Sequence, residues 1–331
     1  MAPTGELVYT VLEVLIAVAC CLGNLMVIWA VCSSGDMRRQ PTFCFIVSLA
    51  VADFLVGGVA VPLAVLVDGR VRTPFYGCVA LCSVVIILTQ ASVHSLLAIA
   101  LDRFLRVYIP LRYRRLVTVR RSWGVVVGCW MTACLLGSTP LLGWSKHQPT
   151  VSNTTLNSTC PPICRFMDVM SIYYMVFFNF LGCILLPMLC TAVLYTSIFR
   201  RIHKQLRNRD AASSDYYQRE RSLACSLVLV LVLFALCWLP IHLINIILLW
   251  APSIVPKEVV YAGILLSHAN SAINPAVYTF KVPRIQKAYG EIWRRYMPDC
   301  GNQGLSSSSP DNTTNLIQMK AIQGGSQNPG A

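Results

Sequence analysis

The stretch Thr42–Val67, TFCFIVSLAVADFLVGGVAVPLAVLV, holds a single charged side chain, Asp53. It exceeds the roughly 20 residues that a helix needs to cross the hydrocarbon core of a bilayer. A carboxylate near the centre of such a helix costs roughly 2.5–3.5 kcal/mol on insertion scales, and side chains kept at that cost mark ion sites, proton relays or switches. Asp53 is therefore the first candidate functional residue.

Six more apolar runs of spanning length follow or precede this one. The seven are Val8–Cys32, Thr42–Val67, Phe75–Leu101, Ser122–Trp144, Val169–Phe199, Ser222–Trp250 and Val259–Phe280. Charged residues make up 12% of the 331 residues, against about 25% in soluble domains. No run alternates like the strands of a membrane β-barrel. We therefore expect an all-α membrane protein, a seven-transmembrane helix bundle.

Prolines occur inside five of the runs, as Pro62, Pro140, Pro187, Pro240 and Pro275. Inside a soluble helix each of them would argue for a break. In a packed membrane bundle the resulting kinks are tolerated, because neighbouring groups satisfy the freed carbonyls. The prolines are thus compatible with seven continuous spans.

The 27 Lys and Arg residues are distributed unevenly. With the N-terminus outside the cell, only a few fall on the outer side, namely Arg70, Arg72, Lys146, Arg165 and Lys257. Because positive residues concentrate in cytoplasmic loops, we predict a multi-pass plasma-membrane protein with an extracellular N-terminus. This topology, together with contact with anionic membrane lipids, accounts for the net charge of +13 without a nucleic-acid partner.

The C-terminal part differs in composition from the bundle. Residues 283–297 repeat with a helical period and predict a short amphipathic helix on the inner membrane surface. Cys300 follows and is a candidate for palmitoylation, with a free cysteine as the alternative. The segment from Gly301 is rich in Ser, Gly, Asn and Gln and predicts disorder. We expect a seven-helix membrane domain with its surface helix over residues 1–298 and a disordered cytoplasmic tail over 299–331.

Three of the 15 cysteines are expected on the outer side: Cys78, Cys160 and Cys164. They predict one disulfide and one remaining thiol. Asn153 and Asn157 each begin an Asn-X-Ser/Thr motif between the fourth and fifth runs, so both are candidate glycosylation sites on the outer side.

Charged and helix-breaking residues also stand near the inner ends of the runs. Asp102 and Arg103 directly follow the third run. Arg103 either extends toward the membrane surface, as long cationic side chains do, or acts as a switch that pairs with Glu220 in one state. In the seventh run, Asn274-Pro275-Ala276-Val277-Tyr278 occupies positions where leucine would be less costly.

Taken in order, these motifs resemble those of rhodopsin-like (class A) G-protein-coupled receptors. The matching residues are Asn24, Asp53, Asp102–Phe104, Trp130, Pro187, Cys237–Pro240 and Asn274–Tyr278. Within that class the chain resembles the adenosine receptors. The stretches that carry this resemblance are Thr89–Ser92, Cys164–Phe166, Trp238–Asn245 and Leu266–Ser271.

The resemblance implies a pocket for adenosine. Phe166 would stack on the adenine ring, and the Asn245 amide would bond the adenine edge as both donor and acceptor. Gln90 is either a ligand group or a bond between helices. The other implied pocket residues are Ile86, Met175, Ile241 and Ile264 around the base; Thr89, Ser267, His268 and His242 near the ribose; Glu13 bonded to His268; Trp238 below; and Asn179 on the fifth run.

The resemblance also implies four further features. Asp53, Ser92, Asn270 and Asn274 would hold an allosteric sodium ion, because a hard cation prefers oxygen ligands. No other cofactor is expected. The disulfide is assigned to Cys78 and Cys164. Asp102, Arg103, Glu220 and Tyr278 would form the switch for G-protein coupling.

The subtype signals are mixed. Met167 and Gly263–Asn270 resemble the third adenosine subtype, whereas His242 and Asn179 resemble the first and the two second subtypes. We favour the third or first subtype, hence inhibitory Gi/o coupling that lowers cAMP, with arrestin as a further partner. Alternatives are a receptor for another nucleoside or small amphiphilic ligand, and an ion-coupled transporter using Asp53. No nucleophile, base and orienting group converge, so an enzyme is not expected.

Overall fold

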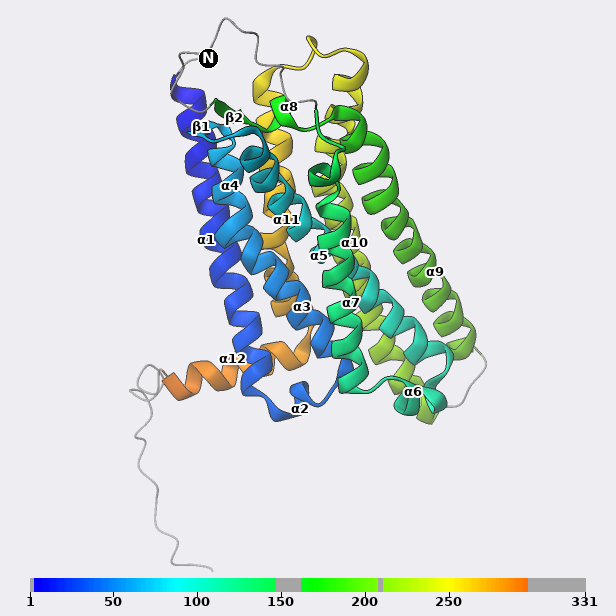
Figure 1. The fold of residues 1–331 in the computed structure, drawn as a ribbon. Helices are drawn as coiled ribbons and strands as arrows, with labels where there is room; N and C mark the ends of the chain where they lie inside the picture. The colour runs from blue at the N-terminus through cyan, green and yellow to red at the C-terminus, as the bar shows by residue number, and fades with distance from the viewer. Residues whose placement is uncertain (1–2, 147–161, 208–210, 297–331) are drawn as a thin grey trace, which may run out of the picture. The chain divides into compact units, whose positions relative to one another are not determined.

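The computed structural model describes residues 3–146, 162–207 and 211–296. Within Met1–Gly290, long helices run side by side as a bundle (Figure 1). The long elements are α1 (Pro3–Ser33), α3 (Pro41–Leu55) with η1 (Val56–Ala60) and α4 (Val61–Leu66), α5 (Phe75–Tyr108), α7 (Val119–Gly137), η3 (Tyr174–Leu185) with α9 (Leu186–Arg207), α10 (Ala211–Trp250) and α11 (Lys257–Lys281). The short helices are α2 (Gly35–Arg38), α6 (Pro110–Leu116), η2 (Thr139–Leu142), α8 (Phe166–Val169) and α12 (Pro283–Tyr296).

Each predicted run corresponds to one of these long elements, which confirms the seven-helix bundle. In the described part of the chain, five helices are long and apolar enough to cross a membrane: Thr4–Ser33, Pro41–Leu66, Phe75–Tyr108, Tyr174–Gln205 and Val228–Trp250. The other two are α7, which begins with charged residues, and α11, whose buried face carries Ser267, His268 and Asn274. Polar residues that face a protein interior lower hydropathy without facing lipid.

Two predicted runs extend beyond their helices. The fourth run was predicted to Trp144, but α7 ends at Gly137 and Pro140 lies in the separate 3-10 turn η2. The fifth run was predicted from Val169, but Val169 belongs to α8 and the helical segment η3 starts at Tyr174. In both cases apolar residues lie beyond the helix: Leu141 and Leu142 are exposed, whereas Val169 and Met170 are buried.

A small sheet was not predicted. Strands β1 (Asp68–Arg72) and β2 (Ile163–Arg165) pair antiparallel, with Asp68 opposite Arg165 and Arg72 opposite Ile163. Gly69 has a positive φ of 92°, which a residue without Cβ adopts readily. We call the end of the bundle that carries β1 and β2 the sheet end.

The described residues include only part of the C-terminal segment for which predictions were made. Helix α12 spans Pro283–Tyr296, close to the predicted 283–297, and Ile285 and Ala288 on one face are buried. By internal contacts the chain divides into Met1–Gly290 and Glu291–Ala331. The predicted boundary at 298 and tail, together with Asn153, Asn157, Cys160 and Cys300, lie outside the described residues.

Polar side chains join several helices of the bundle. The Asn24 amide of α1 donates to the Ser271 carbonyl of α11 at 3.0 Å. The Trp130 indole of α7 donates to the Ser48 hydroxyl of α3 at 3.1 Å, and Ser48 lies 3.0 Å from the Ser95 hydroxyl of α5. Such bonds favour association of helices in a membrane, where hydrophobic burial between helices contributes little. No described side chain of α10 makes a hydrogen bond to another helix.

Helices α1 and α3 approach each other closely at Gly57, in the wide π-turn η1. A Cβ on Gly57 would lie 2.5 Å from the Cys20 Cβ and 2.8 Å from the Ala17 carbonyl oxygen. The next residue, Gly58, is different, because a Cβ there meets only the Cys21 sulfur at 3.7 Å. The packing therefore requires glycine at position 57 but not at position 58.

We predict that Gly57→Ala destabilises the bundle by about 1–3 kcal/mol, the range for overpacking a well-packed core. The measurement is the thermal denaturation midpoint of the detergent-solubilised protein. Gly58→Ala is the matched control and should leave the midpoint unchanged. Equal midpoints for the two variants would contradict the close approach.

Candidate functional site

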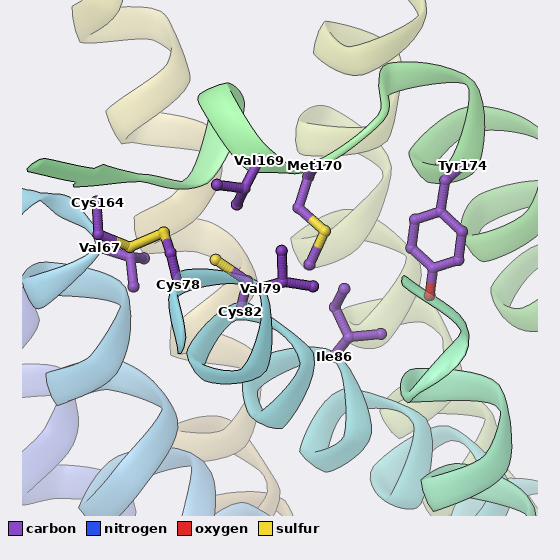
Figure 2. Close-up of a cluster of buried hydrophobic side chains, with 9 residues drawn as sticks. All are labelled: Val67, Cys78, Val79, Cys82, Ile86, Cys164, Val169, Met170 and Tyr174. Carbon is purple, nitrogen blue, oxygen red and sulfur yellow. A yellow bond between two sulfur atoms is a disulfide. The ribbon is translucent and has the colours of Figure 1, made fainter. Parts of the chain in front are cut away.

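A disulfide fixes the cover of the bundle at the sheet end. Cys78 of α5 is bonded to Cys164 of β2, which confirms the predicted pairing. Figure 2 shows the bridge at one side of a buried cluster that includes Val79, Ile86 and Met170. Immediately after β2, the Phe166 amide donates to the Val67 carbonyl at 3.0 Å. These bonds hold Phe166 at the entrance of the bundle.

Beneath Phe166 lies a cavity of about 570 Å³, within the range of small-molecule sites. Of the pocket residues predicted from the sequence, all but Glu13 line it: Ile86, Thr89, Phe166, Met175, Asn179, Trp238, Ile241, His242, Asn245, Ile264, Ser267 and His268. They come from α5, α8, η3, α10 and α11. The structure thus brings the predicted set together, and the roles of the individual residues toward a ligand stay predictions.

Some polar groups near the cavity already have hydrogen-bond partners within the protein, and others do not. Gln90 donates to the Asn179 side chain at 2.9 Å, so the helix-to-helix reading of Gln90 holds in this structure. His242 is 2% exposed and stacks on Phe180 at 4.4 Å between ring centroids. Neither of its ring nitrogens has a hydrogen-bond partner among the described residues. Buried polar atoms in a cavity are available to a ligand.

His268 and Glu13 form a buried pair behind the cavity wall. The Nδ1 atom of His268 lies 2.9 and 2.8 Å from the two Glu13 carboxylate oxygens, as the sequence analysis predicted. Glu13 is fully buried and His268 is 6% exposed. An N–H at Nδ1 facing the carboxylate leaves Nε2 as the atom that meets a ligand.

Several lining residues were missed by the sequence analysis. They lie at the sheet end of the cavity and include Tyr9, Asp68, Arg165, Lys257 and Tyr261. Tyr9 and Tyr261 stack with ring centroids 4.0 Å apart, and the Tyr261 hydroxyl donates to Asp68 at 2.5 Å. One signal was present in the sequence: Glu6, Tyr9 and Glu13 share one face of the first helix by their spacing.

Asp53 is fully buried between three helices. It accepts hydrogen bonds from Ser92 at 3.1 Å, Ser271 at 2.9 Å and Asn274 at 2.7 Å. Ser92 and Asn274 were predicted beside it. The third donor, Ser271, was not among the predicted residues. Asn270, predicted as a ligand of sodium, is buried next to Ser271 in the chain, and its role stays a prediction.

The opposite end of the bundle carries the predicted switch. Asp102 accepts from Thr42 at 2.5 Å and from Tyr113 of α6 at 2.6 Å. Arg103 is 7% exposed and Tyr278 is 1% exposed. The side chain of Glu220 lies outside the described part of the structure, so its pairing with Arg103 stays a prediction.

The class of the protein follows from the fold, the site and a family comparison. The family described as 7 transmembrane receptor (rhodopsin family) matches residues 23–278. The chain belongs to that receptor family and is a multi-pass membrane protein rather than an enzyme.

Curated relatives define the group within the family. The chain is 41% identical over 306 residues to adenosine receptor A2b of Mus musculus, covering 89% of this chain and 92% of the relative. It is 43% identical over 284 residues to adenosine receptor A3 of Ovis aries (85% and 88% covered). It is 40% identical over 313 residues to adenosine receptor A3 of Canis lupus familiaris (92% and 96% covered). Within the rhodopsin family, the chain therefore belongs with the adenosine receptors.

We predict that Cys164→Ser lowers the thermal denaturation midpoint, because a native disulfide contributes typically 2–4 kcal/mol. Cys134→Ser, which changes an exposed free cysteine, is the control and should leave the midpoint unchanged. If the two variants denature together, the bridge to β2 does not stabilise the protein.

Proposed function

We propose that the protein is a plasma-membrane receptor for extracellular adenosine, with its sheet end and N-terminus outside the cell. The observation that carries this proposal is the convergence of three different groups on one cavity. These are the Phe166 ring, the Asn245 amide, which is 7% exposed, and the buried His268–Glu13 pair. The names of the A2b and A3 relatives support the same ligand.

The groups match the two ends of a nucleoside. An aromatic ring binds the flat face of a purine, and an amide donates to a ring nitrogen while accepting from an exocyclic amine. At the other end, Thr89 and Ser267 donate to carbonyls of their own helices at 3.0 and 2.7 Å. Their oxygen lone pairs are left to accept from ribose hydroxyls, next to the Nε2 atom of His268.

Asn245→Ala should abolish measurable binding of adenosine, because the adenine edge would then face an apolar wall. Binding to membranes from expressing cells measures this. Leu243→Ala, at a position of the same helix that is 53% exposed, is the control and should bind normally. Retained affinity in Asn245→Ala would refute the assigned role, and no binding by the unmutated chain would refute adenosine as the ligand. A different nucleoside would then be the alternative.

We further propose that the Asp53 cluster is an allosteric sodium site. Its donor set fits, because one carboxylate and the hydroxyls of Ser92 and Ser271 are hard oxygen ligands within one buried cluster. Asn274 and the predicted Asn270 complete the polar surroundings. If sodium is preferred by one of two states of the bundle, it shifts the population toward that state.

Asp53→Asn should remove the dependence of adenosine affinity on sodium concentration, because the cation loses its charged ligand. The measurement is adenosine affinity in sodium chloride against an equal concentration of a chloride salt with a large organic cation. A sodium effect that persists in Asp53→Asn would place the ion elsewhere.

We propose a heterotrimeric G protein of the Gi/o type as the partner at the opposite end, with arrestin as a second partner. Support for Gi/o comes from the resemblance of Met167 and of Gly263–Asn270 to the third subtype. The A2b and A3 relatives match the chain to nearly the same identity, so identity does not assign the subtype. Adenosine should lower cAMP in expressing cells, and a rise in cAMP would overturn this assignment.

A further inference from the structure

Two neighbouring residues, where α4 is followed by β1, hold different sides of the cavity cover. The Val67 carbonyl accepts from the Phe166 amide at 3.0 Å. The next residue, Asp68, accepts from the Tyr261 hydroxyl of α11 at 2.5 Å. Phe166 follows two residues after Cys164, which the disulfide attaches to α5. A continuous series of bonds therefore runs from α5 through β2 and β1 to α11, across the sheet end of the cavity.

The Asp68–Tyr261 bond is the last link of this series and lies at the edge of the cavity, which both residues line. Tyr261 is in the second turn of α11, which begins at Lys257, and its ring stacks on that of Tyr9 with the centroids 4.0 Å apart. Among the described residues, no other hydrogen bond or ion pair joins β1 to α11. The directional restraint between these two elements thus comes from one side-chain bond.

The three links of the series differ in what their opening costs. The disulfide is covalent, and opening the Phe166–Val67 bond would leave a backbone carbonyl unsatisfied, because Val67 is 2% exposed. For the Asp68–Tyr261 bond, Asp68 is partly exposed and Tyr261 lines the cavity, so water can satisfy both groups when the bond opens. The ends of helices also open more readily than their middles. This bond is therefore the link that opens at the lowest cost.

A second polar contact at the same end of α11 is weaker. The Lys257 ammonium lies 3.4 Å from a Glu6 carboxylate oxygen, and both side chains are about half exposed. Such pairs contribute little in water, whereas a hydrogen bond to a carboxylate belongs to the stronger class. Glu6 therefore offers a control at the same place, because removing its charge changes the end of α11 and leaves both Asp68 and Tyr261 intact.

We propose that the Asp68–Tyr261 bond is a latch that opens when adenosine enters or leaves the cavity. Neither group is assigned to the ligand, so the latch acts on the path and not on the bound state. A bond that is closed in both the free and the occupied receptor slows association and dissociation by the same factor and leaves the equilibrium affinity unchanged. This inference rests on adenosine as the ligand, and it deepens that proposal by naming what sets the rates of exchange.

Tyr261→Phe is the first test, because it keeps the ring that stacks on Tyr9 and removes only the hydroxyl. The association and dissociation rates of tritiated N-ethylcarboxamidoadenosine, an analogue of adenosine, are measured on membranes from cells expressing the full chain. We expect both rates to rise about fivefold, and the equilibrium dissociation constant to stay within about twofold. Tyr76→Phe, the same change at a position that is 63% exposed, is the chemical control and should alter neither rate.

Substitutions of Asp68 separate the hydrogen bond from the charge. Asp68→Ala removes the acceptor and should raise both rates about fivefold, as Tyr261→Phe does, whereas Asp68→Asn keeps a side-chain oxygen that accepts from Tyr261 and should raise them less. Combining Asp68→Ala with Tyr261→Phe should add less than about twofold, because the two residues act through one bond. Glu6→Gln, the control at the same end of α11, should leave both rates within about twofold.

Unchanged rates in both Tyr261→Phe and Asp68→Ala would overturn the latch. So would faster dissociation with an unchanged association rate, because that result is typical of a lost contact with the bound ligand. Effects that multiply independently in the double variant would also contradict it. An unmutated chain that binds neither adenosine nor the analogue defeats the proposed function, whereas normal binding at rates that none of these variants changes defeats the latch alone.

Discussion

The burial of the Asp53 carboxylate is the constraint on which the middle of the bundle depends. A charge in a bilayer has no water to bond, so its partners must come from other helices. Ser92 comes from α5, and Ser271 and Asn274 come from α11. These bonds define the spacing of α3, α5 and α11 at one level. The Asn24 bond to the Ser271 carbonyl attaches α1 at the same level, so one carboxylate organises four helices.

The cavity lies between that level and the covered sheet end. Its lining includes Thr89, Asn179 and Ser267, which already have hydrogen bonds within the bundle, and its cover is held by the Cys78–Cys164 bridge. The side chains assigned to the ligand, such as Asn245 and His242, add polar atoms that the helices do not satisfy themselves. The donors around Asp53 are paired within the protein, whereas His242 and Asn245 line the cavity.

The fold was predictable because helix period and membrane length leave few alternatives. The pocket residues, among them Asn245, His268 and Glu13, were predicted from the resemblance to adenosine receptors, and span length alone would not have singled them out. The β1–β2 sheet could not be predicted, since its pairing joins residues about a hundred positions apart in short, irregular segments. The stack of Tyr9 on Tyr261 was missed for a similar reason: each tyrosine looks like an ordinary membrane-edge aromatic until helices α1 and α11 are brought together.

Helix boundaries were the other weak point. Apolar residues next to Pro140 and Val169 lengthen the apparent spans, although they lie outside α7 and η3. Ser271 was missed as a partner of Asp53. The sequence did not single it out, because Asn270, Ser271 and Asn274 are polar residues close together on α11.

The hydrogen bonds that join the helices are unevenly distributed, and this has a mechanical consequence. Ser48, Ser95 and Trp130 join α3, α5 and α7, while the described side chains of α10 rely on apolar contacts. Apolar contacts are non-directional, so α10 can rotate or slide against its neighbours and exchange one contact for another of similar energy. Trp238, His242 and Asn245 line the cavity from α10. Among the described side chains, a displacement of this part of α10 would therefore break no side-chain hydrogen bond to another helix.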